Sequence, residues 1–262
     1  MVKTLSDPVP TAAKERPRAA TWRLRAAGLA LWPDTCPTAP PFEHGWVHRG
    51  NERMLRRLLA KRRPKVVVEL GSWLGLCTTL LLEETEESGA AVFAVDPWDA
   101  AFLRSDETLH RQYARDPTAV RILDTVPLYD TFLVNVWPYR QRCFPMRMTS
   151  GEGLAAIARL GAPVGMVYVD ADHSYDAVRA DLRACAAHFP DALLCGDDWQ
   201  WPAVQRAVTD HAASHAGLAV HADPTENWWW LEGPAEGAPP AAGCTRKRRR
   251  VEFVAAEESS ES

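Results

Sequence analysis

Apolar and polar positions along the middle of the chain follow two alternating patterns. Short apolar runs rich in β-branched residues predict buried strands, and longer segments with apolar residues three and four apart predict helices. The predicted strands cover residues 65–70, 90–96, 143–148, 163–170, 191–198, 218–222 and 227–232. The predicted helices cover residues 47–63, a segment ending at residue 83, and residues 150–160, 175–188 and 202–215. This alternation predicts an α/β fold, a parallel sheet covered by helices on both faces.

Two parts of the pattern depart from simple alternation. The last two strands have little between them, which predicts an antiparallel hairpin. Residues 98–142 are too many for a plain connection and contain helical stretches. We therefore expect this segment to form a helical cap over one edge of the sheet.

The two ends of the chain lack a sustained period. Residues 1–40 are rich in Pro, Ala and Arg, and residues 233–262 combine Gly, Pro and Ala with the basic run RKRRR at 246–250. Such composition is typical of disordered or loosely packed tails, which leaves a domain at 41–232. The basic run could be a nuclear address or a polyanion contact, and a solvated tail is the alternative.

Charge and cysteine usage narrow the class of protein. The net charge of −4 argues against a general nucleic-acid binder, so the basic tail is the candidate for any such contact. No apolar run approaches the roughly 20 residues of a membrane span. The six cysteines show no metal-ligand spacing and are expected to be reduced thiols of a cytoplasmic protein, or a nuclear one if the basic run is an address.

Carboxylates end four of the first five predicted strands. The end of a buried strand is a costly place for an unpartnered charge, and ligands of doubly wound sheets bind where strands end. These strand ends therefore predict a site. The acids are Glu69, Asp96, Asp170, Asp197 and Asp198.

A glycine-containing turn follows the first of these acids, with the spacing E-x-G-x-x-x-G over residues 69–75. It differs from the GxGxxG of a dinucleotide fold, which counts against an NAD-dependent oxidoreductase. Asp96 ends the next strand, where an acid can accept both hydroxyls of a ribose. The alternative is that Asp96 only caps the turn before Pro97.

Several segments together resemble class I S-adenosylmethionine-dependent methyltransferases, particularly the methyltransferase domain 24-like branch that methylates hydroxyls of sugars or small molecules. They are VVELGSWLG (67–75), FAVDPW (93–98), VYVDADHSYDAVRADL (167–182) and GDDWQWPAVQRAV (196–208), with MRMTSGEGL (146–154) as a partial match. The resemblance covers about residues 45–231. It implies a Rossmann-like, seven-stranded, doubly wound sheet in the order 3-2-1-4-5-7-6, with the last strand antiparallel.

The resemblance also implies positions for S-adenosylmethionine. Asp96 would hold the ribose hydroxyls, and Trp98 and Ser150 would lie near the adenine. The residues expected to line the methionine portion are Glu69, Gly71, Ser72 and Gly75.

Asp170, Asp197 and Asp198 end the fourth and fifth strands, and neighbouring strands lie about 4.8 Å apart. Their charges would repel one another unless a cation lay between them, and Mg²⁺ prefers such oxygen ligands. The resemblance supports the same metal site. The alternative is that one of Asp197 and Asp198 caps the helix that follows, and that no metal binds.

The hydroxyl of an acceptor is a poor nucleophile at neutral pH. A metal held by Asp170 could lower the pKa of this hydroxyl, and a nearby base could take its proton. Two residues follow Asp170 closely, Asp172 and His173, and the resemblance supports either as the base. We favour His173 because histidine titrates near neutral pH. The alternative for His173 is a structural hydrogen bond or a helix cap.

The sequence thus predicts a divalent-metal-assisted O-methyltransferase that acts on a hydroxyl of a sugar or other small molecule. A catechol-type O-methyltransferase is one alternative, because paired hydroxyls also chelate a metal. A cofactor-binding partner or regulatory protein without catalysis is another.

The chain contains 11 tryptophans, an unusual number. We expect Trp73, Trp98, Trp199 and Trp201 to lie at the rim of the pocket, where they could stack on a ligand ring. The expected positions give no role to Trp22, Trp32, Trp46 and Trp137.

Overall fold

The computed structural model describes residues 22–233 apart from 24, 27, 30, 106–110 and 112. The basic run at 246–250 and most of the two predicted tails lie outside the described residues. Among the described residues, no helix is both long and apolar enough to cross a membrane.

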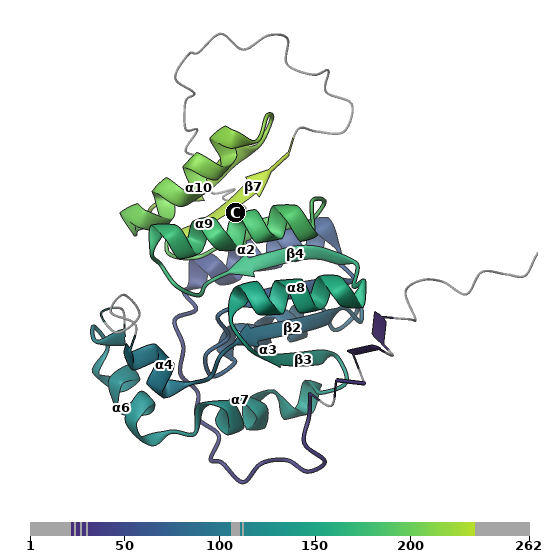
Figure 1. Ribbon diagram of the computed structural model, residues 1–262, viewed down its shortest axis with the longest axis vertical. Helices are drawn as coiled ribbons and strands as arrows, with labels where there is room; N and C mark the ends of the chain where they lie inside the picture. Colours follow the sequence, from purple (N-terminus) through teal and green to yellow (C-terminus); the bar gives the residue numbers. More distant parts are fainter. Residues whose placement is uncertain are drawn as a thin grey trace, which may run out of the picture.

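Seven strands form one sheet in the order β3-β2-β1-β4-β5-β7-β6 (Figure 1). All neighbouring strands pair in parallel except β7, which runs antiparallel to both β5 and β6. This confirms the predicted fold and strand order. The strands are β1 (Val66–Leu70), β2 (Ala91–Asp96), β3 (Cys143–Arg147), β4 (Val164–Val169), β5 (Leu193–Gly196), β6 (Ala219–Asp223) and β7 (Trp228–Glu232).

Helices cover both faces of the sheet, as the alternating pattern predicts. The helices of the first face are α2 (Arg49–Arg62), α3 (Leu76–Glu84) and α7 (Leu128–Val136), and those of the second are α8 (Ser150–Leu160), α9 (Tyr175–His188) and α10 (Pro202–Ser214). Alternate residues of β1 enter opposite cores, since Val67 packs with the first set and Val66 and Val68 with the second.

Strand β7 shows the same alternation with three tryptophans. Trp228 and Trp230 lie in the core of the first face and stack at 4.8 Å, while Trp229 is completely buried in the core of the second. The period of two places these large rings on both faces of the sheet. The three rings therefore do not share one core.

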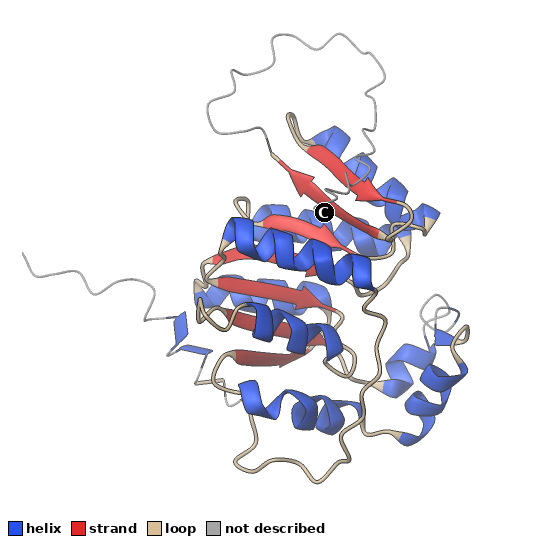
Figure 2. Cartoon of the chain, turned by 180° about the vertical axis from the view of Figure 1, so that it is seen from behind, coloured by secondary structure: helices blue, strands red, loops and turns tan. Residues whose placement is uncertain are grey.

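The described part of residues 98–142 forms the expected cap. Helices α4 (Ala100–Ser105) and α6 (Pro117–Thr125) lie beyond the ends to which the parallel strands point, and α7 runs along the outer strand β3 (Figure 2). A short 3₁₀ turn, η1 (Trp137–Tyr139), leads back into the sheet. The cap therefore stands next to the edge where the strand-end acids gather.

Two described tryptophans that precede the expected boundary at residue 41 pack on the sheet. Trp22 is 3% exposed and packs against Phe93 and Phe144, with ring centroids 5.7 and 5.8 Å away. Trp32 donates its indole N–H to the carbonyl of Cys143 at 3.0 Å. The physical reason is that β3 is an edge strand, whose exposed apolar side chains need a cover that local sequence pattern does not reveal.

Candidate functional site

A cavity of about 580 Å³ lies at the carboxyl ends of β1, β2, β4 and β5, between the sheet and the cap. Its walls include four of the five predicted strand-end acids, namely Asp96, Asp170, Asp197 and Asp198. The expectation that the acids share one site is met by these four.

The turn between β1 and α3 is built by glycines for reasons of protein packing. Gly71 has φ +84°, and a Cβ there would overlap the carbonyl of Asp170. Gly75 has φ +89°, and a Cβ there would press on Val136 and Phe132 of α7. Only glycine combines this backbone conformation with such close neighbours. Gly71 borders the cavity, whereas Gly75 lies outside its lining and faces α7.

Asp96 holds this turn in place through backbone hydrogen bonds. Its Oδ2 accepts the N–H groups of Ser72 at 3.1 Å and Trp73 at 2.9 Å, and its Oδ1 accepts that of Trp98 at 2.7 Å. Burial raises the pKa of Asp96 to about 6, and the three donors partly offset that effect. The turn-capping role is therefore observed. The same side chain borders the cavity, so it could also bind a ribose there, and that role stays a prediction.

Glu69 lies beneath the turn rather than in the cavity wall, which differs from the expected contact with a ligand. Its Oε2 accepts the hydroxyls of Ser72, at 2.5 Å, and Thr78. The side chain is completely buried, and burial raises its pKa to about 7 despite these hydroxyls. Ser72 does line the cavity, so Glu69 is hydrogen-bonded to a residue of the cavity wall.

The two residues expected near an adenine have different fates. Ser150, at the start of α8, lines the cavity. Trp98 does not; its ring packs on Phe132 at 4.4 Å, and its indole N–H donates to the carbonyl of Trp73 at 2.6 Å. The ring of Trp98 thus lies in the core of the cap side rather than in the cavity wall, and its place near the adenine stays a prediction.

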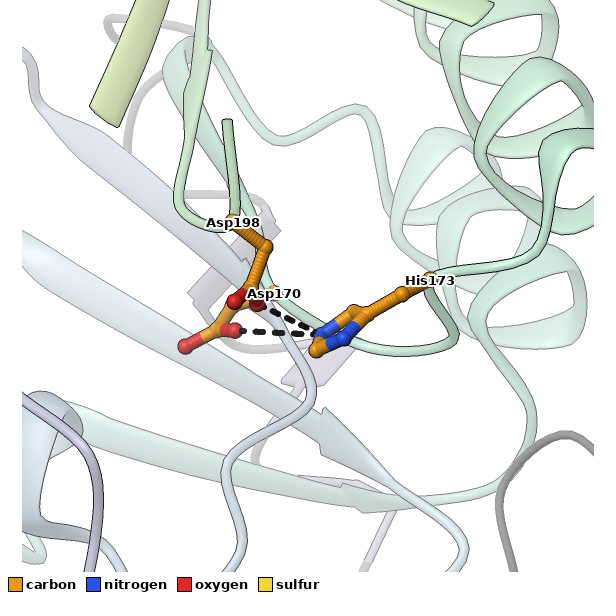
Figure 3. Close-up of side chains that lie close together, drawn as sticks. All are labelled: Asp170, His173 and Asp198. Carbon is orange, nitrogen blue, oxygen red and sulfur yellow. Dashed lines mark ion pairs between the residues drawn. The ribbon is translucent and has the colours of Figure 1, made fainter. Parts of the chain in front are cut away.

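The end of β4 and the segment after β5 bring three polar side chains together (Figure 3). His173 Nε2 lies 2.6 Å from Asp198 Oδ2 and 3.9 Å from Asp170 Oδ1. One ligand atom from each residue falls within 4.8 Å of the others, so the three could share one ion. We call this group the acid–histidine cluster.

Burial and charge compete within the acid–histidine cluster. Burial, followed by the charges of Asp197 and Asp198, raises the pKa of Asp170 well above its ordinary value, against the effect of His173. Burial alone would lower the pKa of His173, but its carboxylate partners outweigh it and raise that pKa to about 10. The carboxylates thus favour the protonated imidazole, whose charge would offset the repulsion that the sequence predicts.

Asp197 lies beside the cluster but is held by other groups. Its Oδ1 accepts the backbone N–H of Asp198 at 2.6 Å and the amide of Asn227 at 3.1 Å. Burial and the charge of Asp198 raise its pKa to about 7. His173, rather than Asp197, joins Asp170 and Asp198 in the acid–histidine cluster. The role of Asp197 as a metal ligand stays a prediction.

Neither helix-cap alternative is observed. Helix α10 begins after Trp201 with no capping side chain, so neither acid of the 197–198 pair caps it. Helix α9 is capped by the hydroxyl of Ser174, and Asp172 accepts the N–H of that same serine at 2.7 Å. The cap of α9 is thus Ser174 rather than His173, and both candidate bases line the cavity.

One wall of the cavity contains aromatic and polar groups that were not predicted from the sequence. We call these groups, together with Trp73, the roof: His44, Trp46, Tyr113 and Asp116. His44 Nδ1 accepts the indole N–H of Trp73 at 3.1 Å, and its Nε2 lies 3.3 Å from Asp116. Trp46 donates to the same carboxylate at 3.2 Å, and Tyr113 stacks on Trp73 at 5.0 Å. These residues come from segments far apart in sequence. Only the aromatic character of Trp46 could have suggested the roof.

The expected rim of tryptophans is partly corrected. Trp73 and Trp201 line the cavity, and Trp46 joins them, whereas Trp98 and Trp199 lie in the core. The ring of Trp201 meets His173 edge to face at 5.1 Å.

Comparison with known proteins places the chain in a family. A family model described as a methyltransferase domain matches residues 68–199, just over half of the chain. No curated protein matches the sequence. Among solved structures, a methyltransferase from Podospora anserina bound to SAH has 10% identity and a TM-score of 0.49, with 88% of this chain and 100% of that one covered.

Two further structures are similar at the same level. An O-methyltransferase from Bacillus cereus in complex with SAH has 12% identity and a TM-score of 0.45, and the match covers 84% of this chain and 91% of that one. A methyltransferase from Geobacter sulfurreducens has 16% identity and a TM-score of 0.44, with coverage of 84% and 89%. The family match over residues 68–199, on a sheet with the expected strand order, shows that the chain belongs to the methyltransferase-domain family of class I S-adenosylmethionine-dependent methyltransferases.

Proposed function

We propose that this protein transfers the methyl group of S-adenosylmethionine to a hydroxyl oxygen of a sugar or other small molecule, with help from a divalent cation. One observation carries the proposal. A single cavity has Asp96 at the end of β2 and the acid–histidine cluster at the ends of β4 and β5. A donor and an acceptor can thus occupy one space under one roof.

The donor fits the half of the cavity around Asp96. The Asp96 carboxylate suits ribose hydroxyls, Ser72 and Gly71 border the path toward Asp170, and Ser150 lies on the adenine side. Acidic walls also favour the positive sulfonium of the donor. The bound donor supplies an electrophilic methyl group, and these residues orient it toward the acid–histidine cluster.

The cation fits the acid–histidine cluster. The carboxylates of Asp170 and Asp198 offer oxygen atoms within 4.8 Å of each other, the kind of ligand that Mg²⁺ or Mn²⁺ prefers, and His173 beside them is reserved for proton transfer rather than counted as a ligand. Asp197 is a further expected ligand at its edge. When bound, such an ion lowers the pKa of an acceptor hydroxyl and orients its oxygen.

Proton removal is assigned to His173 on its position, with Asp172 as the alternative. Both side chains line the cavity next to Asp170. Asp170 and Asp198 are the partners that raise the pKa of His173. Engagement of those carboxylates by a cation would favour the neutral imidazole, the form that accepts a proton.

A catechol-like phenol is the second candidate acceptor. Trp46, Tyr113 and Trp201 line the cavity, and their rings offer stacking surfaces for a planar acceptor. A sugar ring can pack on the same surfaces, so the acceptor itself must be found by experiment.

Calorimetry with S-adenosylhomocysteine and with Mn²⁺, followed by a screen of hydroxyl compounds with labelled donor, tests the proposal. We expect S-adenosylhomocysteine to bind without metal. We expect methyl transfer to stop when EDTA is added and to return with Mg²⁺. Failure to bind S-adenosylhomocysteine would overturn the donor assignment. Transfer unaffected by EDTA, together with an active Asp198→Asn variant, would remove the cation while leaving the methyltransferase.

A further inference from the structure

We propose that Asn227, in the turn between β6 and β7, is a positioning residue that holds Asp197 and Asp198 in the arrangement that receives the cation. The inference rests on the proposed cation site. Asn227 is outside the cavity lining, so any effect on a ligand must pass through other residues.

Asn227 binds the segment after β5 at four successive residues. Its Nδ2 donates to Asp197 Oδ1 at 3.1 Å and lies 3.4 Å from Asp198 Oδ1. Its Oδ1 accepts the backbone N–H of Gln200 at 2.7 Å, and its carbonyl accepts that of Trp199 at 3.2 Å. One residue thus satisfies donors and acceptors along the whole segment that carries the acid pair.

The contacts also set the rotation of the Asp198 carboxylate. Its Oδ1 faces the Asn227 amide, and its Oδ2 pairs with His173 at 2.6 Å. A carboxylate held at both oxygens has little freedom to turn away from the cavity. Groups that orient a ligating side chain in this way commonly change metal affinity 10- to 100-fold when removed.

Backbone conformation gives a second, independent observation. Asp198 has φ +64° and Asn227 has φ +65°, the left-handed region that non-glycine residues rarely adopt. Asparagine is among the residues that tolerate this region, which suits it to the turn. Asp198 keeps the same unusual conformation while its segment is bound to Asn227, and such conformations persist where the surroundings enforce them.

The test is Mn²⁺ titration of the purified full chain, by calorimetry, with the wild type and Asn227→Gly. Glycine keeps the left-handed turn and removes only the amide. We expect Mn²⁺ binding at least about tenfold weaker, with S-adenosylhomocysteine affinity within about twofold of wild type. The second measurement shows that the variant is folded and that the Asp96 half is intact.

Thr225→Ala is the matched control. Thr225 lies in the same turn and its hydroxyl donates to Asp223 at 2.6 Å, but among the described residues it makes no hydrogen bond with Asp197 or Asp198. We expect this variant to bind Mn²⁺ like the wild type. Equal losses in both variants would show that the rigidity of the turn, rather than the Asn227 amide, matters and would overturn the inference.

Two other outcomes separate this inference from the proposed function. Wild-type Mn²⁺ affinity in Asn227→Gly would overturn the positioning role and leave the cation site standing. A wild type that binds no Mn²⁺ would remove both the cation site and the role of Asn227. If the glycine variant does not bind S-adenosylhomocysteine, Asn227→Ser, a small residue common in turns, is titrated with the same expectation.

Discussion

The two halves of the cavity stabilise their buried carboxylates in different ways. Around Asp96, three backbone N–H groups from residues 72, 73 and 98 surround one carboxylate. In the acid–histidine cluster, the titratable side chain of His173 lies within 3.9 Å of both Asp170 and Asp198, through the same nitrogen. Backbone donors are neutral and cannot leave, whereas an imidazolium can lose its charge or give up its place.

This difference suggests a division of labour. The Asp96 half is a rigid surface made by a turn whose shape its own acid maintains. The acid–histidine cluster depends on a replaceable positive charge, which suits a place where a cation enters and a proton leaves. The predictions below are ordered by expected size, and each tries to break or sharpen this contrast.

The largest effect, on folding and on ligand binding together, is expected for Asp96→Ala. The change leaves three buried N–H groups without their acceptor, so the free energy of unfolding should fall by about 3 kcal/mol. Binding of S-adenosylhomocysteine should weaken at least about 100-fold, as for loss of a buried charged partner. Calorimetry and urea unfolding measure both. Asp191→Ala, an exposed acid before β5, is the control, and an Asp96→Ala variant with normal affinity would contradict the rigid-surface description.

The stability of the fold is also expected to depend on pH through Asp181, a second buried acid, which interacts with Ser150 of the cavity wall. Burial, partly offset by the Ser150 hydroxyl, raises the pKa of Asp181 from 3.8 to about 7. Between these values the folded state binds more protons than the unfolded one, so this group costs stability as pH rises from about 4 to 7 and costs nothing below. Urea unfolding should show Asp181→Asn gaining up to about 4 kcal/mol over wild type at pH 8. No difference between pH 4 and pH 8 would refute it.

Asp198→Asn is expected to act on the cluster alone. Loss of one charged ligand should weaken Mn²⁺ binding about 10- to 100-fold, while S-adenosylhomocysteine affinity stays within about twofold. Paired titrations of one preparation with the two ligands measure this. Equal losses for both ligands would mean that the two halves are not separate.

The smallest effect is expected at the contact between cap and cluster. The guanidinium of Arg115 lies 4.4 Å from the ring of Trp201, which in turn meets His173. Because Arg115 is exposed, Arg115→Ala should cost only about 0.5 kcal/mol in urea unfolding. Arg121→Ala, exposed on α6, serves as the control. A loss above about 2 kcal/mol would show that the cap is bound to the cluster far more tightly than one surface contact implies.

Much of the fold could be predicted because its information is local. Strand ends such as Leu70 and Asp96, and helices such as Ser150–Leu160, follow from runs of apolar residues and from their period. Gathering of the acids at one edge follows as well, since parallel strands end on the same side.

The failures have one common cause, which is the direction of a side chain. Glu69 and Trp98 stand at the predicted turns, yet the first points beneath the turn and the second into the cap. Neither direction follows from position in sequence, because each depends on neighbours such as Thr78 and Phe132 that other elements supply. The burial of Trp22 against Phe144 of β3 likewise depends on a contact between distant segments, which the local sequence pattern does not reveal.

The sequence by itself therefore determined the sheet, its order through family resemblance, and the acids at its edge. Tertiary structure alone decided which groups partner those acids: backbone N–H for Asp96, His173 for Asp198, and Asn227 for the segment that carries it. Periodicity records which face of an element is buried, and that is a property of the element alone. The partner of a buried charge is a property of distances between elements, and these exist only once the chain has folded.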